Sequence, residues 1–264
     1  MPPWSLISPA SRGIGFALAK RVLQETNAPV VVTARKDLDK TKEELLDGTN
    51  IDESRLRVLK LDVLDESTIA DAAAECKKHF DPKNHTLQLA FMVPGILFPE
   101  KAPAQIDAEK ALLTFRTNTI GPMLMIKHFS PFLPKKNASR NNGDEMKGLP
   151  SIATAAVMSA RVGSISDNSL GGWYSYRASK AGVNQLVKTF DNHLKTSSGD
   201  NAMAVALHPG TVKTDLSKDF WGNVKKEKLF ERDWVAERLI DVVTEVGVEG
   251  RGKCWDWDGK EVPP

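Results

Sequence analysis

Short, almost uniformly apolar runs alternate along the chain with longer stretches in which apolar residues recur every three or four positions. The short runs are typical of strands buried on both faces, and the longer period is typical of amphipathic helices. The runs predict strands at residues 4–7, 30–33, 56–61, 87–93, 153–159, 203–207 and 253–257. The periodic stretches predict helices at residues 15–24, 37–46, 66–79, 108–129, 174–195 and 233–246. This alternation predicts an α/β protein: one doubly wound Rossmann domain over residues 1–264, with about seven parallel strands and helices on both faces.

Two segments break the alternation. Residues 135–150 are polar, contain glycine and show no apolar period, which predicts a loop insertion. Residues 216–230 are irregular as well, but they carry four large apolar side chains among lysines: Phe220, Trp221, Leu229 and Phe230. A cover over a ligand cavity and ordinary aromatic packing are both open interpretations of this second segment.

The composition fits one globular domain and suggests few partners. With 264 residues, 41% of them hydrophobic and 27% charged, the chain can bury one substantial core. A net charge of +2 and short basic pairs at 135–136 and 225–226 do not indicate a nucleic-acid partner. No apolar run approaches the roughly 18 residues of a membrane span, and the first four residues lack a charged leader. We therefore expect no membrane partner and a cytoplasmic location.

Cys76 and Cys254 are the only cysteines in the sequence. So few cysteines suit buried thiols in a reducing compartment better than a disulfide scaffold. The five histidines show no ligand-like spacing, either with one another or with the cysteines. We therefore expect no metal site.

A glycine turn follows the first predicted strand. The stretch Ser8-Pro-Ala-Ser-Arg-Gly13-Ile-Gly15 comes after the apolar run 4–7 and leads into a helical pattern. Because glycine has no Cβ, backbone N–H groups of such a turn can approach a pyrophosphate, whose charge the positive end of the following helix favours. The turn therefore predicts a dinucleotide site, and a left-handed turn with only a structural purpose is the alternative.

Tyr176 and Lys180 stand four residues apart in the predicted helix 174–195, so their side chains project from one face. A phenol has a reference pKa of about 10, and lowering this pKa to about 7 requires roughly 4 kcal/mol. An ammonium about 4 Å away, at an effective dielectric near 20, supplies about that energy. The pair therefore predicts a tyrosine tuned for general acid–base catalysis, whereas a packed Tyr176 beside a solvated Lys180 is the alternative.

Taken together, these motifs resemble the short-chain dehydrogenase/reductase family across essentially the whole chain. That family has a glycine turn, a helical asparagine in mid-chain, and a tyrosine followed four positions later by a lysine. Here Asn118 fits the asparagine, Asp62-Val63 fits the acid on the adenine side, and residues 208–214 fit the nicotinamide loop. The stretches 159–165, 171–180 and 255–260 look like the branch that contains C-factor and sniffer-type carbonyl reductases.

The resemblance implies an oxidoreductase that transfers a hydride between NADP(H) and a small carbonyl or alcohol substrate, with carbonyl reduction favoured. Tyr176 would then donate the proton, and Lys180 would also bind the nicotinamide ribose. Asn118 would hold a water of the proton relay, and a helix kink before Pro122 is the alternative explanation of this asparagine.

The same resemblance assigns the surroundings of the site. It implies that residues 216–230 form a lid over the substrate, that Trp173 and Phe98 line the same cavity, and that homodimers or homotetramers form through helices near 108–129 and 174–195. The residues expected to bind the cofactor are Ser8, Ser11, Arg12, Gly13, Ile14, Gly15, Arg35, Asp62, Val63, Pro94, Gly95, Tyr176, Lys180, Pro209, Gly210, Val212 and Thr214.

The choice between the two nicotinamide cofactors is predicted from the residue twenty positions after the glycine turn. Enzymes that use NAD often place an acid there for the ribose 2′-OH, while an arginine suits a 2′-phosphate. Here that residue is Arg35, and Arg12 in the turn can approach the same phosphate. We therefore expect NADPH to be preferred. Asp37 turned toward the ribose, or an Arg35 that is merely solvated, would weaken this prediction.

One catalytic position departs from the family pattern. The family serine stands three residues before a glycine, and here that residue is Ala160, which has no hydroxyl. Ser164, in the following turn, is favoured as its replacement over Ser159, because side chains alternate across a strand and Ser159 would face the wrong side. A site without this hydrogen-bond donor is the third alternative.

Two prolines also depart from the family pattern. Pro9 stands where the family has the first turn glycine. After the fourth strand, Val93-Pro94-Gly95 stands where Asn-Ala-Gly is usual, so an amide that braces the central sheet is lost. With Ala160, these departures leave open a different class of function, a cofactor-binding redox sensor or scaffold with little turnover. Asn118, Tyr176 and Lys180 together favour an enzyme.

Overall fold

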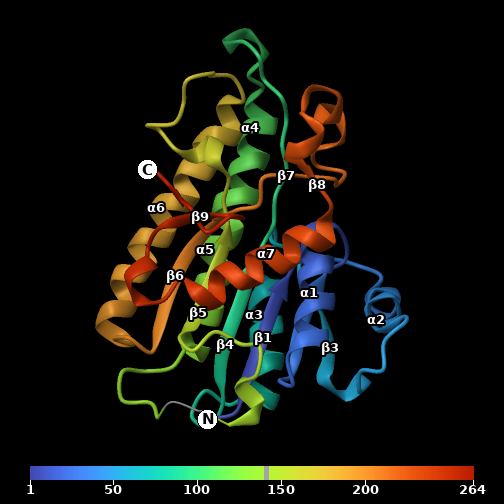
Figure 1. Cartoon of the computed structure of the whole chain (residues 1–264), viewed down its shortest axis with the longest axis vertical. Coiled ribbons are helices and arrows are strands. Elements are labelled where there is room, and N and C mark those ends of the chain that lie inside the picture. Colours follow the sequence, from blue (N-terminus) through green and yellow to red (C-terminus); the bar gives the residue numbers. More distant parts are fainter. Residues whose placement is uncertain (140–142) are drawn as a thin grey trace.

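The computed structural model describes residues 1–139 and 143–264, which form one domain around a mixed sheet of eight strands. The strand order is β10-β9-β6-β5-β4-β1-β2-β3, and the seven strands from β9 to β3 are parallel (Figure 1). The prediction of seven parallel strands is confirmed, and the antiparallel edge strand β10 is an addition. The strands are β1 (Pro3–Ser8), β2 (Val30–Ala34), β3 (Leu56–Lys60), β4 (Thr86–Met92), β5 (Ala153–Met158), β6 (Ala202–His208), β9 (Cys254–Asp256) and β10 (Glu261–Val262).

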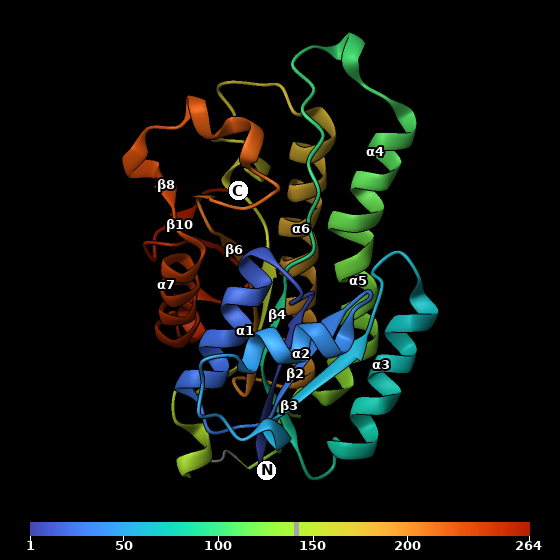
Figure 2. The same ribbon diagram turned by 90° about the vertical axis from the view of Figure 1, so that its right-hand side faces the viewer.

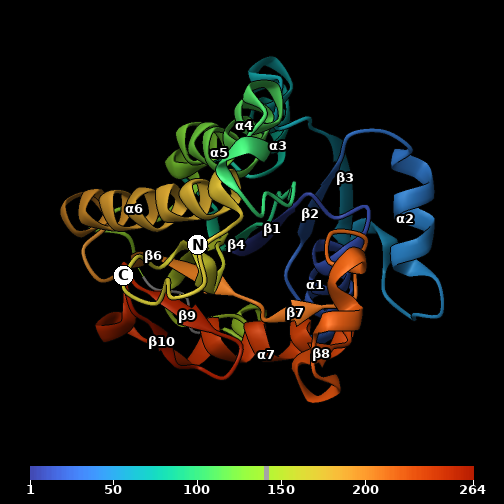
Figure 3. The same ribbon diagram turned by 90° about the horizontal axis from the view of Figure 1, so that it is seen from above.

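Helices cover both faces of the sheet, as the doubly wound fold requires (Figure 3). One face carries α1 (Gly13–Glu25), α2 (Leu38–Leu46) and α7 (Arg232–Glu245). The other carries α3 (Glu66–His79), α5 (Gly121–Phe129) and α6 (Tyr174–Ser197). α4 (Ala108–Phe115) joins α5 through one π-helical turn, Arg116–Ile120, so the single helix predicted at 108–129 is continuous but locally widened. Such turns often occur at functional sites.

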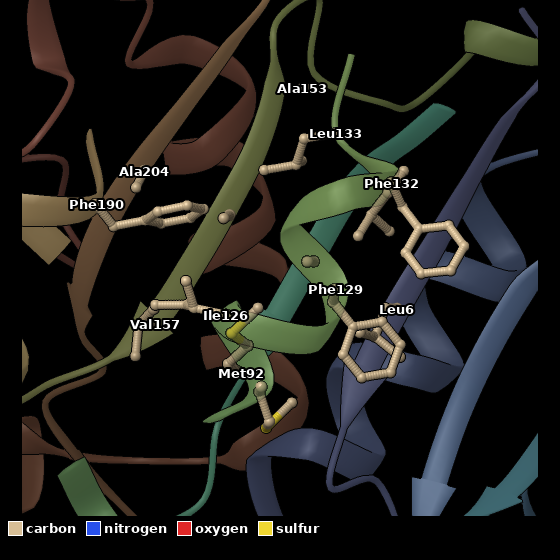
Figure 4. Packing of buried hydrophobic residues seen from close by; sticks show 14 of the residues in the cluster. Leu6, Met92, Ile126, Phe129, Phe132, Leu133, Ala153, Val157, Phe190 and Ala204 are labelled. Atoms are coloured by element: carbon tan, nitrogen blue, oxygen red, sulfur yellow. The ribbon is translucent and has the colours of Figure 1, made fainter. Parts of the chain in front are cut away.

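The core consists of two apolar layers, one on each face of the sheet. Alternating residues of β1 divide between them, with Trp4 and Leu6 packed toward α3 and α5, and Ile7 packed toward α1. Figure 4 shows the first layer, in which Phe129 and Phe132 of the α5 region lie close to Leu6. This two-sided burial explains why the strands appear in the sequence as continuous apolar runs.

The remaining expectations about the fold have mixed outcomes. Within the predicted loop insertion at 135–150, residues 140–142 lie outside the described part of the chain, and the rest forms turns with a buried Leu149. Cys76 and Cys254 are both buried free thiols, as expected. No helix among residues 1–139 and 143–264 is long and apolar enough to cross a bilayer.

Candidate active site

The predicted site residues gather above the carboxyl ends of the parallel strands. Figure 2 shows the segments that follow β4, β5 and β6 rising together at this end of the sheet, next to the start of α1. A small parallel pair, β7 (Thr211–Val212) and β8 (Leu229–Phe230), closes the same end. Ligands of doubly wound folds bind at such an edge.

The glycine turn after β1 has the shape that a close backbone approach requires. Gly13 has a φ of +60°, and a Cβ on Gly15 would lie 1.9 Å from the main-chain oxygen of Pro9. The Ser8–Pro9 peptide bond is cis, and the hydroxyl of Ser8 lies 2.6 Å from the Thr33 hydroxyl. The turn leads directly into the N-terminus of α1, where Ser11 and Ile14 also lie. Backbone N–H groups at a helix N-terminus fit a dinucleotide pyrophosphate.

Exposed cations lie beside this turn. Arg35 follows β2, and Lys36 next to it is also exposed. Arg12 is exposed as well, with one guanidinium nitrogen 3.8 Å from a carboxylate oxygen of Asp215. Asp37 adopts a left-handed backbone (φ 56°) at the start of α2, and its side chain does not cap that helix. The site therefore offers cations at the position expected for a 2′-phosphate, and one nearby acid.

The residues on the adenine side follow β3. Asp62 is half-buried, and one of its carboxylate oxygens accepts a hydrogen bond from the Leu64 N–H (3.0 Å). Val63 packs closely on α5, and a Cβ added to Gly121 would lie 2.9 Å from the Cβ of Val63. Asp62 and Val63 thus lie between the end of β3 and α5.

Asn118 holds the segment that follows β4. Its side-chain oxygen accepts from the Ile96 N–H (2.9 Å), and its amide donates to the Ile96 carbonyl (3.0 Å). The same amide donates to the Ser179 hydroxyl (3.0 Å), which in turn donates to the Tyr176 carbonyl (2.8 Å). Asn118 is completely buried in the π-helical turn, so it joins the Pro94–Gly95 segment to the tyrosine helix.

Tyr176 and Lys180 come together on the buried face of α6. The Lys180 ammonium nitrogen lies 5.8 Å from the centre of the Tyr176 ring and donates to the Met158 carbonyl at the end of β5 (2.7 Å). Both side chains are buried, at 8% and 2% exposure respectively. No hydrogen bond from another described residue engages the Tyr176 hydroxyl, which leaves it available to a substrate.

The pKa values of this pair differ from the expectation that Lys180 would lower that of Tyr176. Burial raises the pKa of Tyr176 to about 12. Burial also lowers the pKa of Lys180 to about 7, because the charged ammonium is removed from water. Desolvation therefore outweighs the ammonium–phenol attraction in the protein alone, and Tyr176 holds its proton tightly.

The serines near β5 have separate hydrogen-bond partners. The Ser159 hydroxyl donates to the side-chain oxygen of Asn184 on α6 (2.6 Å). The buried Ser164 hydroxyl donates to the main-chain oxygen of Pro264 (3.3 Å) and accepts from the Asp167 N–H (3.1 Å). Ala160 is buried at the turn between them. The catalytic role of Ser164 stays a prediction, and its hydroxyl would have to exchange these bonds for one to substrate.

The nicotinamide loop lies against both the glycine turn and the predicted lid. A Cβ on Gly210 would lie 2.6 Å from the Phe230 ring, and a Cβ on Gly13 would lie 3.6 Å from the Thr214 methyl group. Pro209 and Val212 are buried behind this loop. In the predicted lid, Leu216 reaches toward Gly95, whose Cβ would lie 3.5 Å from it.

The structure adds three residues that the sequence patterns did not single out. Lys36 lies beside Arg35, Glu100 binds the start of α6, and Arg177 donates to the carbonyls of three residues in the loop before α6: Val162, Gly171 and Gly172. Lys36 could have been predicted from the sequence, because it is the second of two adjacent basic residues after β2. Glu100 and Arg177 act through tertiary hydrogen bonds that no local pattern reveals.

Comparison with known proteins identifies the family. A family model described as enoyl-(acyl carrier protein) reductase matches residues 10–247. The chain therefore belongs to this family of short-chain dehydrogenases/reductases and is an oxidoreductase. The resemblance found in the sequence is confirmed.

Relatives and solved structures cover nearly the whole chain. The 1-hydroxy-2-glutathionyl-2-methyl-3-butene dehydrogenase of Rhodococcus sp. (strain AD45) is 27% identical over 255 residues, 96% of each chain. The structure of NADPH-bound carbonyl reductase from chicken fatty liver matches 98% of each chain with a TM-score of 0.80 and 27% identity. The carbonyl reductase Sniffer of D. melanogaster matches 100% of each chain with a TM-score of 0.80, and at 23% identity it shows the shared fold.

The contact between Gly15 and Pro9 predicts the effect of one added methyl group. Gly15→Ala should lower the free energy of unfolding by about 2–3 kcal/mol, because the new Cβ must displace rigid backbone. Urea unfolding measures this loss, and Gly222→Ala is the control because a Cβ there meets nothing within 4 Å. Equal stability of the Gly15→Ala and wild-type proteins would contradict the turn described here.

The kcat/KM values of three folded variants test whether Ser164, Ser159 or neither donates a hydrogen bond to the substrate oxygen. We expect Ser164→Ala to lower kcat/KM by about tenfold or more, in keeping with the loss of an oxyanion donor. Ser159→Ala should change it little, because that hydroxyl is bound to Asn184. No loss in Ser164→Ala together with a gain in Ala160→Ser would show that the site lacks this donor.

Proposed function

We propose that the protein is an NADPH-dependent carbonyl reductase in which Tyr176 protonates the substrate oxygen. The observation that supports this best is the convergence of Asn118, Tyr176 and Lys180 at the strand ends beside the glycine turn. The NADPH-bound carbonyl reductase with a TM-score of 0.80 supports the choice of both cofactor and substrate class.

The residues present fit a nicotinamide dinucleotide. The turn from Ser8 to Gly15 would hold the pyrophosphate, because it leads into the N-terminus of α1, whose first N–H groups and positive end favour an anion. Arg12 and Arg35 would bind the 2′-phosphate, Asp62 and Val63 the adenine side, and the 209–214 loop the nicotinamide side. When bound, NADPH supplies the hydride that reduces the carbonyl carbon.

The side chains of the protein then manage one proton. As the substrate oxygen gains negative charge, the Tyr176 hydroxyl donates its proton to that oxygen, which gives the alcohol product. Lys180, held at the end of β5 by the Met158 carbonyl, lies 5.8 Å from the centre of the Tyr176 ring and has a pKa of about 7, so its ammonium form is populated near neutral pH and stabilises the phenolate that the transfer leaves. Asn118 keeps the segment that bounds the substrate in place, and we propose that it also holds a water behind Lys180.

The tightly held proton of Tyr176 favours reduction over alcohol oxidation. A developing alkoxide is a stronger base than a phenolate, so a tyrosine with a pKa of about 12 still transfers its proton to it. Oxidation needs the phenolate as a base, and this form is scarce near neutral pH when the pKa lies near 12. We therefore infer that carbonyl reduction is the faster direction at pH 7.

The substrate lid, the assembly and the location stay proposals. We propose that residues 216–230 cover the substrate, because Phe220 packs on Trp173 with ring centres 4.9 Å apart. Exposed Leu112, Ile120 and Met123 along α4 and α5 support self-association as a homodimer or homotetramer. We also propose a cytoplasmic location, which the two buried free thiols Cys76 and Cys254 support because a reducing compartment keeps thiols free.

The redox-sensor alternative is separated from the reductase by turnover. Nicotinamide fluorescence measures binding, and a panel of aldehydes, quinones and diketones measures reduction. Binding of NADPH without turnover across the whole panel would support the sensor instead.

Removal of a single hydroxyl tests the proton donor. We expect Tyr176→Phe to keep the fold and NADPH affinity while kcat falls by about 10²–10⁴, the usual contribution of a general acid. Tyr174→Phe is the matched control, because Tyr174 is 40% exposed and its partner four residues on is Ala178. Near-normal turnover by a folded Tyr176→Phe protein would refute the assigned role.

A charge reversal tests the cofactor preference. Arg35→Asp should raise the Kd of NADPH by at least about tenfold, because a charge-assisted contact to the 2′-phosphate is replaced by repulsion. The Kd of NADH should change much less, since NADH lacks that phosphate. Lys40→Asp on the exposed face of α2 controls for net charge. Equal weakening of both cofactors by Arg35→Asp would contradict the assignment.

A further inference from the structure

A carboxylate from a distant segment caps the helix that carries Tyr176. Glu100, in the segment after β4, is 3% exposed. Its carboxylate accepts hydrogen bonds from the Ser175 N–H (2.8 Å) and the Ser175 hydroxyl (2.5 Å). Its main-chain oxygen accepts from the Trp173 N–H (2.6 Å). Glu100 therefore occupies the amino end of α6 with two different acceptor groups.

This carboxylate has no basic side chain to neutralise it. Among residues 1–139 and 143–264, no lysine, arginine or histidine forms an ion pair with Glu100. A buried carboxylate is costly unless it is well hydrogen-bonded, and here the Ser175 donors and the positive end of the 24-residue helix α6 serve that purpose. Within the described part of the chain, the buried carboxylate of Glu100 is therefore stabilised by the start of α6 alone.

The helix depends on Glu100 because its own first residues cannot cap it. The N-cap residue is Trp173, which has no side-chain acceptor and makes no side-chain cap. Its backbone is left-handed (φ 50°, ψ 47°), a conformation that bulky residues rarely adopt. Glu100 binds the N–H of this residue and borders Gly172, whose Cβ would lie 3.3 Å from the Glu100 carbonyl oxygen.

The unusual backbone places the indole of Trp173 between the tyrosine and the predicted lid. The Trp173 ring meets the Tyr176 ring edge to face, with centres 6.1 Å apart and planes at 78°. Its other neighbour is Phe220 of the segment 216–230, with ring centres 4.9 Å apart. One wall of the Tyr176 side chain is thus a ring whose position Glu100 determines.

We propose that Glu100 is a positioning residue that fixes the first turn of α6, and with it the direction in which Tyr176 presents its hydroxyl. This inference rests on the proposed reductase function. Through Trp173, the same clamp sets the surface on which Phe220 of the segment 216–230 packs. Misplacement of a reacting group by about 1 Å costs up to about a hundredfold in rate, so a hydrogen-bond clamp of this kind is needed for turnover rather than for binding.

Three variants test the role of Glu100: Glu100→Ala, Glu100→Gln and the control Asp107→Ala. Asp107 is an exposed N-cap residue whose carboxylate also caps a helix, α4, by accepting from the Lys110 N–H (2.9 Å). We expect Glu100→Ala to lower kcat by about tenfold to a hundredfold, with the KM and the Kd of NADPH nearly unchanged. Glu100→Gln, which keeps the shape and one acceptor, should lose less, and Asp107→Ala should keep its kcat. A normal kcat in folded Glu100→Ala, or an equal loss in Asp107→Ala, would overturn the proposal.

Amide hydrogen exchange supplies a readout that does not depend on turnover. In Glu100→Ala, amides of residues 173–177 should exchange faster than in the wild type, while those of residues 186–195 in the same helix should not. If the wild type reduces no carbonyl but exchange changes as expected, the proposed function fails and the clamp stands. Unchanged exchange at residues 173–177 overturns the clamp. If Glu100→Ala does not fold, Glu100→Gln decides, and its normal kcat would overturn the proposal.

Discussion

The site depends on the hydrogen bonds of one buried amide. Asn118 binds both the N–H and the carbonyl of Ile96 and also the Ser179 hydroxyl, so it joins the segment after β4 to the amino-terminal part of α6. The π-helical turn that contains Asn118 breaks the regular pairing of a long helix at this point. Together with the Glu100 contacts to Trp173 and Ser175, these bonds fix the segment after β4 against α6.

Burial then determines the chemistry of the two groups on α6. Burial of both side chains raises the pKa of Tyr176 to about 12 and lowers the pKa of Lys180 to about 7. At neutral pH the tyrosine is therefore protonated, and the lysine is present in both its charged and its uncharged form. The expectation that Lys180 would lower the pKa of Tyr176 assumed a fully charged ammonium about 4 Å from the phenol. In the structure the Lys180 amine is buried and donates to the Met158 carbonyl. A protonated phenol beside a readily charged amine suits proton donation.

Much of the fold could be predicted from the sequence because each strand is buried on both faces and so appears as an unbroken apolar run. The glycine turn and the Tyr176–Lys180 pair could also be predicted, because each depends only on residues that are close together in the sequence. Strand β10 escaped detection because it is only two residues long. Glu100 escaped because its partner, Ser175, lies 75 positions away in sequence, and hydrogen bonds over such distances leave no pattern.

In the proposed reaction, hydride from NADPH and a proton from Tyr176 convert a carbonyl into an alcohol. We would measure this transfer with NADPH carrying deuterium at the transferable C4 position and mass spectrometry of the alcohol formed from a diketone or an aldehyde. We expect one deuterium on the former carbonyl carbon with the wild type, and a rate at least about a hundredfold lower with Tyr176→Phe. Tight NADPH binding with no deuterated product from any of these substrates would contradict it.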